Sequence, residues 1–238
     1  WTRDTQYDLI HFDTISLIPF FDCIPPDTTT VLDHHNIESH MLLRRAGNES
    51  NALKKFYFWQ EGARLAAYEK KYCPKFSLNI TCSDVDTERL RECSPASNVV
   101  TVPNGVDLDY FKPQQQTRNG KRLIFVGTMN WYPNIEAVMY IADHVWPALK
   151  ARHADLEIDI IGANPPDTVK NLAQRLPGFH VHGFVDDVRP YIDAAAVYVC
   201  PIRDGGGTKL KILDAMAMAK AIVAHPIACE GITVSNGS

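Results

Sequence analysis

Three consecutive glycines near the C-terminal end of the chain make the segment best suited to bind an anion. Gly205–Gly207 follow a strand-like apolar run and precede Thr208 and Lys209, where a helical pattern begins. Glycine lets backbone amides approach a ligand closely, and the first turn of a helix presents unpaired N–H groups and a positive dipole end. We therefore expect this turn to bind phosphate, with Lys209 adding a formal positive charge.

A second interpretation of the glycine segment is a flexible loop in which Thr208 is an ordinary helix cap. The segment matches neither GxxxxGK[ST] nor GxGxxG, which disfavours a P-loop or a nicotinamide site. Farther along the helical pattern, Asp214 is placed to accept two hydrogen bonds from the hydroxyls of a ribose. The alternative role for Asp214 is that of a surface acid, a residue type favoured in the N-terminal half of a helix. We expect the buried apolar stripe of this helix to contain Leu210, Leu213 and Ala217.

Two other strand ends carry residues that could line the same kind of site. Gly127 and Thr128 close the run LIFVG, and Asn134 is expected to cap or open the following helix. Gly183–Val185 end a later strand, where backbone groups could contact a nucleobase and Phe184 could supply apolar surface. The alternative for this last segment is a plain strand-to-helix turn with an Asp cap.

Two adjacent histidines, His34 and His35, end a strand in the N-terminal half. An imidazole at a strand end can face a cleft and donate a hydrogen bond to a hydroxyl or phosphate oxygen. A structural role is the ordinary alternative for a histidine.

Apolar runs alternate with longer amphipathic segments along the whole chain. Several runs are almost continuously apolar, which is typical of parallel strands covered on both faces. The expected strands are 8–13, 29–33, 76–82, 99–103, 122–127, 156–162, 180–183, 197–201 and 221–224. The expected helices are 37–46, 51–72, 84–92, 134–150, 166–175, 188–195 and 208–219. This alternation predicts an α/β protein with parallel sheets.

A segment rich in Asp, Gln, Asn and Gly, residues 105–121, interrupts the alternation and is expected to be a linker. It divides the chain into a first domain over 1–110 and a second over 111–238. Because the chain begins with Trp1 and stops shortly after a strand-like run, we expect both domains to be incomplete.

The composition narrows the function classes. The formal net charge of −4 provides no basic field for nucleic acid. The six cysteines form no CxxC pair and no zinc-like Cys/His cluster, which favours a reducing, cytoplasmic compartment and no bound metal. No apolar stretch is long enough to span a bilayer.

Five segments, taken in order, resemble the retaining glycosyltransferases of the GT-B fold, family 4. They are VPNGVDLDYFKP, VGTMNWYPNIEAV, GFVDDVRPYIDAAAVYVCPI, DGGGTKLKILDAMAMAKAIVA and CEGI. The first domain adds LDHHNIES and Ser83-Asp84. The resemblance implies two Rossmann-like domains: an acceptor-side domain over 1–110 and a donor-binding domain over 111–238.

The resemblance also implies roles for individual residues. His35 matches the acceptor-domain histidine beside the donor sugar, with His34 as the fallback, and Asp214 matches the glutamate that binds ribose. The remaining implied donor-binding residues, which would contact the phosphates or the base, are Gly127, Thr128, Asn134, Gly183, Phe184, Val185, Arg203, Gly206, Gly207, Thr208 and Lys209. The implied reaction moves a hexose from a nucleotide diphosphate sugar to a glycan or lipid-linked acceptor in polysaccharide biosynthesis. It proceeds with retention and needs no protein nucleophile, metal or other cofactor.

Three positions depart from the family pattern. Gly206 stands where the family usually has a glutamate, Asp214 is one methylene shorter than Glu, and Met129 and Asn134 replace an Arg and a Lys. Two further readings therefore stay open: a nucleotide-binding module without catalysis, and a nucleotide-sugar epimerase on the same fold.

Basic residues are also mixed with apolar or aromatic ones in two helical segments, 42–45 and 54–59. Such helices can lie on an anionic bilayer, which would place the protein peripherally at the inner face of the membrane. Helix packing with a solvated basic edge is the alternative.

Overall fold

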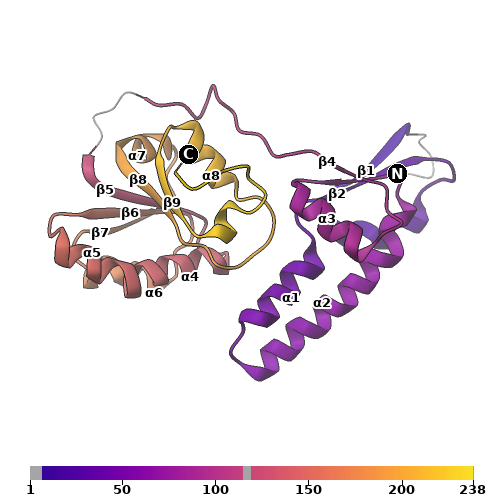
Figure 1. Cartoon of the computed structure of the whole chain (residues 1–238), viewed down its shortest axis with the longest axis horizontal. Coiled ribbons are helices and arrows are strands. Elements are labelled where there is room, and N and C mark those ends of the chain that lie inside the picture. Colours follow the sequence, from indigo (N-terminus) through magenta and orange to yellow (C-terminus); the bar gives the residue numbers. More distant parts are fainter. Residues whose placement is uncertain (1–6, 115–118, 238) are drawn as a thin grey trace. The chain divides into compact units, whose positions relative to one another are not determined.

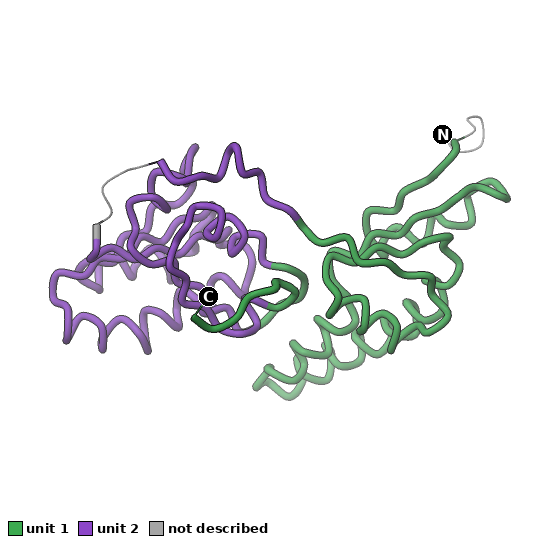
Figure 2. Tube along the Cα trace, turned by 45° about the horizontal axis from the view of Figure 1, so that its top comes forward, with its two compact units in different colours: residues 1–104, 204–208, 230–238 green, residues 105–203, 209–229 purple. Residues whose placement is uncertain are grey.

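The computed structural model describes residues 7–114 and 119–237, and the contacts in it divide the chain into two compact units. Figure 2 colours these units, which are composed as follows: unit 1 is Trp1–Asn104, Asp204–Thr208 and Glu230–Ser238, and unit 2 is Gly105–Arg203 and Lys209–Cys229. Unlike the expected first domain, unit 1 also contains the glycine turn and the last segment of the chain. The acceptor and donor roles assigned to the two domains stay predictions.

Unit 1 is built on a four-stranded parallel sheet in the order β1-β2-β3-β4. Its strands are Leu9–Phe12 (β1), Thr29–His34 (β2), Leu78–Thr81 (β3) and Val99–Thr101 (β4). All four were expected from the apolar runs. Because they are parallel, the residues that follow β2 and β3 emerge at the same edge of the sheet.

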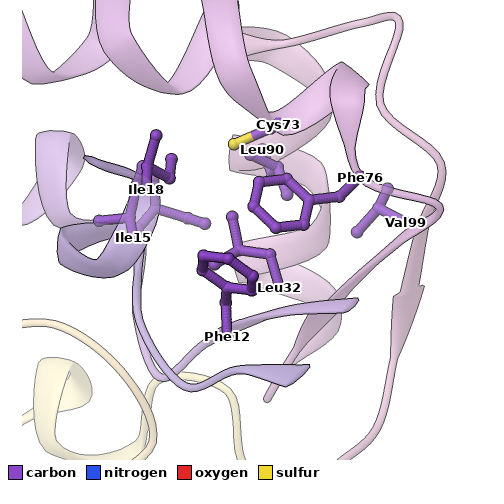
Figure 3. Packing of buried hydrophobic residues seen from close by; sticks show 9 residues of the cluster. Phe12, Ile15, Ile18, Leu32, Cys73, Phe76, Leu90 and Val99 are labelled. Carbon is purple, nitrogen blue, oxygen red and sulfur yellow. The ribbon is translucent and has the colours of Figure 1, made fainter. Parts of the chain in front are cut away.

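The apolar core of unit 1 lies between this sheet and its helices. The helices are Glu38–Asn48 (α1), Ala52–Tyr72 (α2), Asp84–Cys93 (α3) and two 3-10 helices, Ile15–Cys23 and Cys73–Lys75. Figure 3 shows Phe12, Leu32 and Leu90 packed among the other apolar residues of this core. The rings of Phe12 and Phe76 meet edge to face with centroids 5.2 Å apart, a geometry that adds to the area buried.

Unit 2 holds a five-stranded parallel sheet in the order β7-β6-β5-β8-β9. Its strands are Asn119–Val126 (β5), Glu157–Ile161 (β6), Phe179–Gly183 (β7), Ala195–Cys200 (β8) and Ala221–Ala224 (β9). Along the chain, β6 and β7 are added on one side of β5, and β8 and β9 are then added on the other side. Ligands bind at such a reversal, beyond the carboxyl ends of the strands.

Helices cover both faces of the second sheet, with α4, α5 and α6 on one face and α7 and α8 on the other (Figure 1). Their bounds are Tyr132–Tyr140 (α4), Trp146–Arg152 (α5), Asp167–Arg175 (α6), Arg189–Ala194 (α7) and Leu210–Ala217 (α8). A short 3-10 helix follows at Pro226–Cys229. Within the described ranges, no helix has the length and apolar character needed to cross a bilayer.

Two expected elements differ in the structure. The single helix predicted over 134–150 is interrupted by a π-helical turn, Ile141–Val145, because Pro147 just beyond it lacks the N–H that continues a regular helix. The predicted linker ends earlier than expected, since Asn119–Lys121 belong to β5. Residues 115–118 of that linker lie outside the described residues, as does Trp1.

Candidate functional site

The backbone is closely packed at the carboxyl end of β5. A Cβ atom on Gly162, which follows β6, would lie 1.9 Å from the carbonyl oxygen of Gly127. A Cβ on Gly127 would lie 2.6 Å from the Lys211 ammonium and 2.8 Å from the Asn134 side chain. Both positions therefore require glycine, and the absence of a side chain at Gly127 is what lets two polar groups approach this strand end.

Asn134 has a different role from the one expected. The helix begins at Tyr132, so Asn134 is inside its first turn and does not cap it. Its side chain is buried: Nδ2 donates to the Thr128 carbonyl at 2.8 Å, and Oδ1 accepts from Lys211 Nζ at 2.6 Å. Asn134 thus ties the exposed Thr128 turn to the helix and holds the Lys211 ammonium.

Lys211 is a functional candidate that the sequence reasoning missed. Its ammonium lies 5.2 Å from the Phe125 ring centroid and hydrogen-bonds Asn134, and no carboxylate in the described part of the chain forms an ion pair with it. Burial lowers the pKa of Lys211 to about 8. A largely enclosed cation with no carboxylate at ion-pair distance costs free energy, and a bound anion would relieve that cost.

Asp214 is half-buried and lies on the same helix. Burial raises the pKa of Asp214 to about 6, and the charge of Lys211 offsets only part of this effect. The predicted apolar stripe on this helix was wrong, because Leu210 is exposed while Ile212, Ala215 and Met218 are buried. The helix is apolar on most sides, so the spacing alone did not determine which side packs against the sheet.

Gly183 ends β7 with φ at +72°. This left-handed conformation favours glycine, and a Cβ there would meet nothing within 4 Å, so the backbone angle and not crowding explains the residue. The carbonyl of Gly183 accepts from the Gly162 amide at 2.8 Å. Phe184 is 73% exposed and Val185 half-buried, so the Phe184 ring is accessible from solvent, and its contact with a nucleobase stays a prediction.

Arg203 is exposed, and its guanidinium lies 4.2 Å from the centroid of the Tyr140 ring. This cation–π contact holds an arginine just after β8 without neutralising its charge. Its expected role in phosphate binding stays a prediction.

The glycine turn of unit 1 packs against the segment between β2 and α1. A Cβ on Gly207, whose φ is +65°, would lie 2.4 Å from the His35 carbonyl oxygen, and a Cβ on Gly206 would lie 3.1 Å from Asn36 Cβ. The Thr208 hydroxyl lies 3.5 Å from the Cys82 carbonyl oxygen. Thr208 is not the helix cap, since α8 begins at Leu210 after Lys209. The glycines are therefore needed for close packing within this unit, besides any contact with a ligand.

Charged groups hold both later segments of unit 1 in place. Arg44 donates to the Gly205 carbonyl at 2.9 Å and pairs with Glu230 at 2.9 Å, while Arg45 pairs with Asp204 at 3.2 Å. Burial alone would raise the pKa of Glu230, but hydrogen bonds from Arg44 and Arg89 hold it at about 2. The two arginines of the segment 42–45 are thus committed to internal ion pairs, not to a solvated basic edge.

The two histidines at the end of β2 have different surroundings. His34 is buried and shares a 3.0 Å hydrogen bond with Asn79, and burial lowers its pKa. His35 is exposed, and its Nε2 lies 3.2 Å from an Asp13 carboxylate oxygen. Only His35 is therefore accessible to a substrate, and the fallback, His34, is a structural residue of the β2–β3 pair.

No group of three or more His, Cys, Asp or Glu side chains in residues 7–114 and 119–237 is arranged to hold a metal ion. The polar groups gathered at the carboxyl end of β5 in unit 2 are an ammonium, an amide and a carboxylate. This set suits a phosphorylated ligand that also carries hydroxyl groups.

The chain is similar to known proteins over much of its length. Residues 120–237 match the family described as glycosyl transferases group 1. A phosphatidyl-myo-inositol mannosyltransferase of Mycolicibacterium smegmatis is 31% identical over 166 residues, which cover 66% of this chain and 42% of that protein. An uncharacterised 44.6 kDa protein of the Klebsiella pneumoniae cps region is 20% identical over 211 residues, covering 85% of this chain and 53% of that protein.

Solved structures share the fold. TarM has a TM-score of 0.71 at 12% identity, covering 96% of this chain and 43% of that one. Anabaena HepE, solved in complex with UDP and glucose, has a TM-score of 0.67 at 17% identity, and the match covers 97% of this chain and 62% of the HepE chain. The α/β architecture with two parallel sheets is confirmed, and the chain spans about half the length of the curated relatives it matches.

Proposed function

Because the chain belongs to the glycosyl transferases group 1 family, we propose that it binds a nucleotide diphosphate sugar and transfers the sugar with retention. The observation that carries the proposal is the Lys211 ammonium, which lies beside Gly127 at the end of the central strand of the second sheet and has no ion-pair partner among the described residues. A diphosphate is the anion that the proposed reaction brings to such a position.

The chemistry of the transfer explains what these groups would do. The transition state has oxocarbenium character, and negative charge grows on the departing diphosphate. A cation and backbone amides already aimed at that charge stabilise the transition state more than the ground state. We assign this role to Lys211 and to the amides of Gly206–Lys209, with Thr128 and Arg203 as further phosphate contacts.

Other parts of the donor are assigned to the remaining residues. The Asp214 carboxylate would accept hydrogen bonds from the ribose hydroxyls, and Gly183–Val185 would contact the base. His35, whose exposed imidazole is held by Asp13, is assigned a contact with the reacting sugar. None of these roles needs a metal ion or a protein nucleophile.

The relatives suggest which substrates to test first. HepE was solved with UDP and glucose, and the mycobacterial relative transfers mannose to a phosphatidyl-inositol, by its name. We therefore propose a hexose donor and a glycan or lipid-linked acceptor, with polysaccharide synthesis as the process, which the cps-region relative also suggests. We place the protein in the cytoplasm, because its six cysteines include no CxxC pair and lie singly along the sequence.

The test is titration of the chain with UDP, GDP and ADP, followed by incubation with the sugar form of whichever nucleotide binds. We expect one diphosphate to bind and to raise the thermal midpoint, since a ligand of the native state stabilises it. Release of free sugar or its transfer supports the proposal. Binding without turnover would favour the nucleotide-binding module without catalysis, an alternative that the glycine at position 206 in place of the family glutamate also supports. Conversion to an epimeric nucleotide sugar would favour the epimerase.

A further inference from the structure

The hairpin formed by α1 and α2 in unit 1 ends in a surface that the proposed function does not use. The two helices run side by side, and their connected ends project away from the sheet of that unit (Figure 1). Every residue from Asn51 to Gln60 is exposed except Phe58, which packs near the Arg45 guanidinium. Helix packing, the alternative left open by the sequence, therefore accounts for Phe58 but not for its neighbours.

The exposed residues at the start of α2 are mostly large and apolar. Leu53 is 83% exposed, Phe56 60%, Tyr57 59% and Trp59 54%. At about 100° per residue, the side chains of Ala52, Leu53, Phe56, Tyr57 and Trp59 cover an arc of roughly 160° on the helix. Large apolar side chains gathered on one exposed face indicate an interaction surface, because scattered ones would need no explanation.

A groove continues this apolar face between the two helices. It has a volume of about 480 Å³ and is lined by Leu43, Ala46 and Gly47 of α1 and by Phe56 and Trp59 of α2. The small residues of α1 leave the space, and the two aromatic rings form the opposite wall. The surface therefore offers apolar area and depth for a hydrocarbon chain.

The charges around this face favour an anionic binding partner. Lys54 and Lys55 flank the apolar arc, and Lys55 also borders the groove. No carboxylate occurs between Ser50 and Gln60. The nearest acids on either side are engaged, Glu49 with Arg45 and Glu61 with Arg64. Because this helix also begins there with its positive dipole end, the surface is complementary to anionic headgroups.

We propose that the start of α2, residues 52–59, docks on an anionic lipid bilayer. Phe56, Trp59 and Leu53 enter the boundary between headgroups and acyl chains, where Trp and Tyr side chains are favoured, while Lys54 and Lys55 extend to the lipid phosphates. The docking is a property of unit 1 and does not depend on the proposed sugar transfer, since its test reads out binding to vesicles alone.

The experiment is flotation of the whole chain with vesicles of phosphatidylglycerol and phosphatidylcholine, compared with phosphatidylcholine alone. We expect binding only to the anionic vesicles, weakened by salt. Lys54→Gln/Lys55→Gln should weaken binding by roughly tenfold or more at low salt, at about 1 kcal/mol for each lysine near such a surface. Phe56→Ser/Trp59→Ser should weaken it at least as much, through lost apolar burial.

Two matched controls give the test its specificity. Lys70→Gln/Lys71→Gln makes the same charge change at the other end of α2, and Phe20→Ser removes a ring that is 63% exposed elsewhere in unit 1. Neither should change vesicle binding. Absence of binding to anionic vesicles, or equal losses in the controls, would overturn the proposal. So would a concentration-dependent dimer that Phe56→Ser/Trp59→Ser abolishes, because a second copy would then cover the surface.

Discussion

Replacing Lys211 with Met should make the free protein more stable and the bound complex weaker. The ammonium is buried with one hydrogen bond, to Asn134, and with no ion pair in the described part of the chain. Its pKa is about 8 instead of 10.5, a difference equivalent to about 3 kcal/mol at ~1.4 kcal/mol for each pH unit. Methionine has a similar shape without the charge. Allowing about 1–2 kcal/mol for the unpaired Asn134 oxygen, we expect a net gain of about 1–2 kcal/mol.

The size of this stability gain also depends on pH. Between about 8 and 10.5 an unfolded lysine still holds its proton while the folded Lys211 has lost it. The unfolded state therefore binds more protons, and the contribution of Lys211 to stability rises with pH across this window. The stability gained in Lys211→Met should accordingly be largest below pH 8 and disappear near pH 10.

Binding should change in the opposite direction. A hydrogen bond to a charged group contributes about 1.5–3 kcal/mol, so Lys211→Met should weaken nucleotide diphosphate binding by roughly ten- to a hundredfold. Calorimetric titration and chemical unfolding of the same samples measure both effects.

Lys220→Met is the matched control. That buried lysine already donates to the carbonyls of Asp193 and Ala195 and pairs with Asp193, so its loss should lower stability and leave binding unchanged. Unaltered nucleotide affinity in Lys211→Met would refute the assignment of the phosphate cation.

Three further outcomes can be checked on the same chain. Affinity for the nucleotide sugar, whose phosphates do not titrate near neutrality, should peak between pH 6 and 8, because Asp214 is protonated below about 6 and Lys211 deprotonated above about 8; a flat profile would contradict both roles. Asp214→Ala should weaken nucleotide binding but not pyrophosphate binding, and equal losses would remove the ribose contact. Gly162→Ala should lower the free energy of unfolding by at least about 1–3 kcal/mol through its clash with the Gly127 carbonyl, whereas Gly120→Ala, with open space around it, should not, as urea titration would show.

Much of the fold was predictable because it depends on patterns short enough to read locally. Apolar runs identified the strands of both sheets, and in the second sheet the residues at the ends of these runs identified Gly127 and Gly183. The residues of the helix after the glycine turn were harder to place, since a helix that is apolar on most sides does not reveal which side is buried. That uncertainty is why Lys211 was overlooked and Leu210 was wrongly placed in the core.

The sequence by itself determined the order of strands and helices, the glycines at the strand ends and the absence of a basic field. Only the tertiary structure decided which polar side chains meet. It buried His34 against Asn79 while exposing His35, and it brought Lys211 to Asn134, 77 residues away along the chain. It also paired Arg44 with Glu230 but left Phe56 and Trp59 exposed. These outcomes depend on the burial and charge of neighbours distant in the chain, which local spacing does not contain.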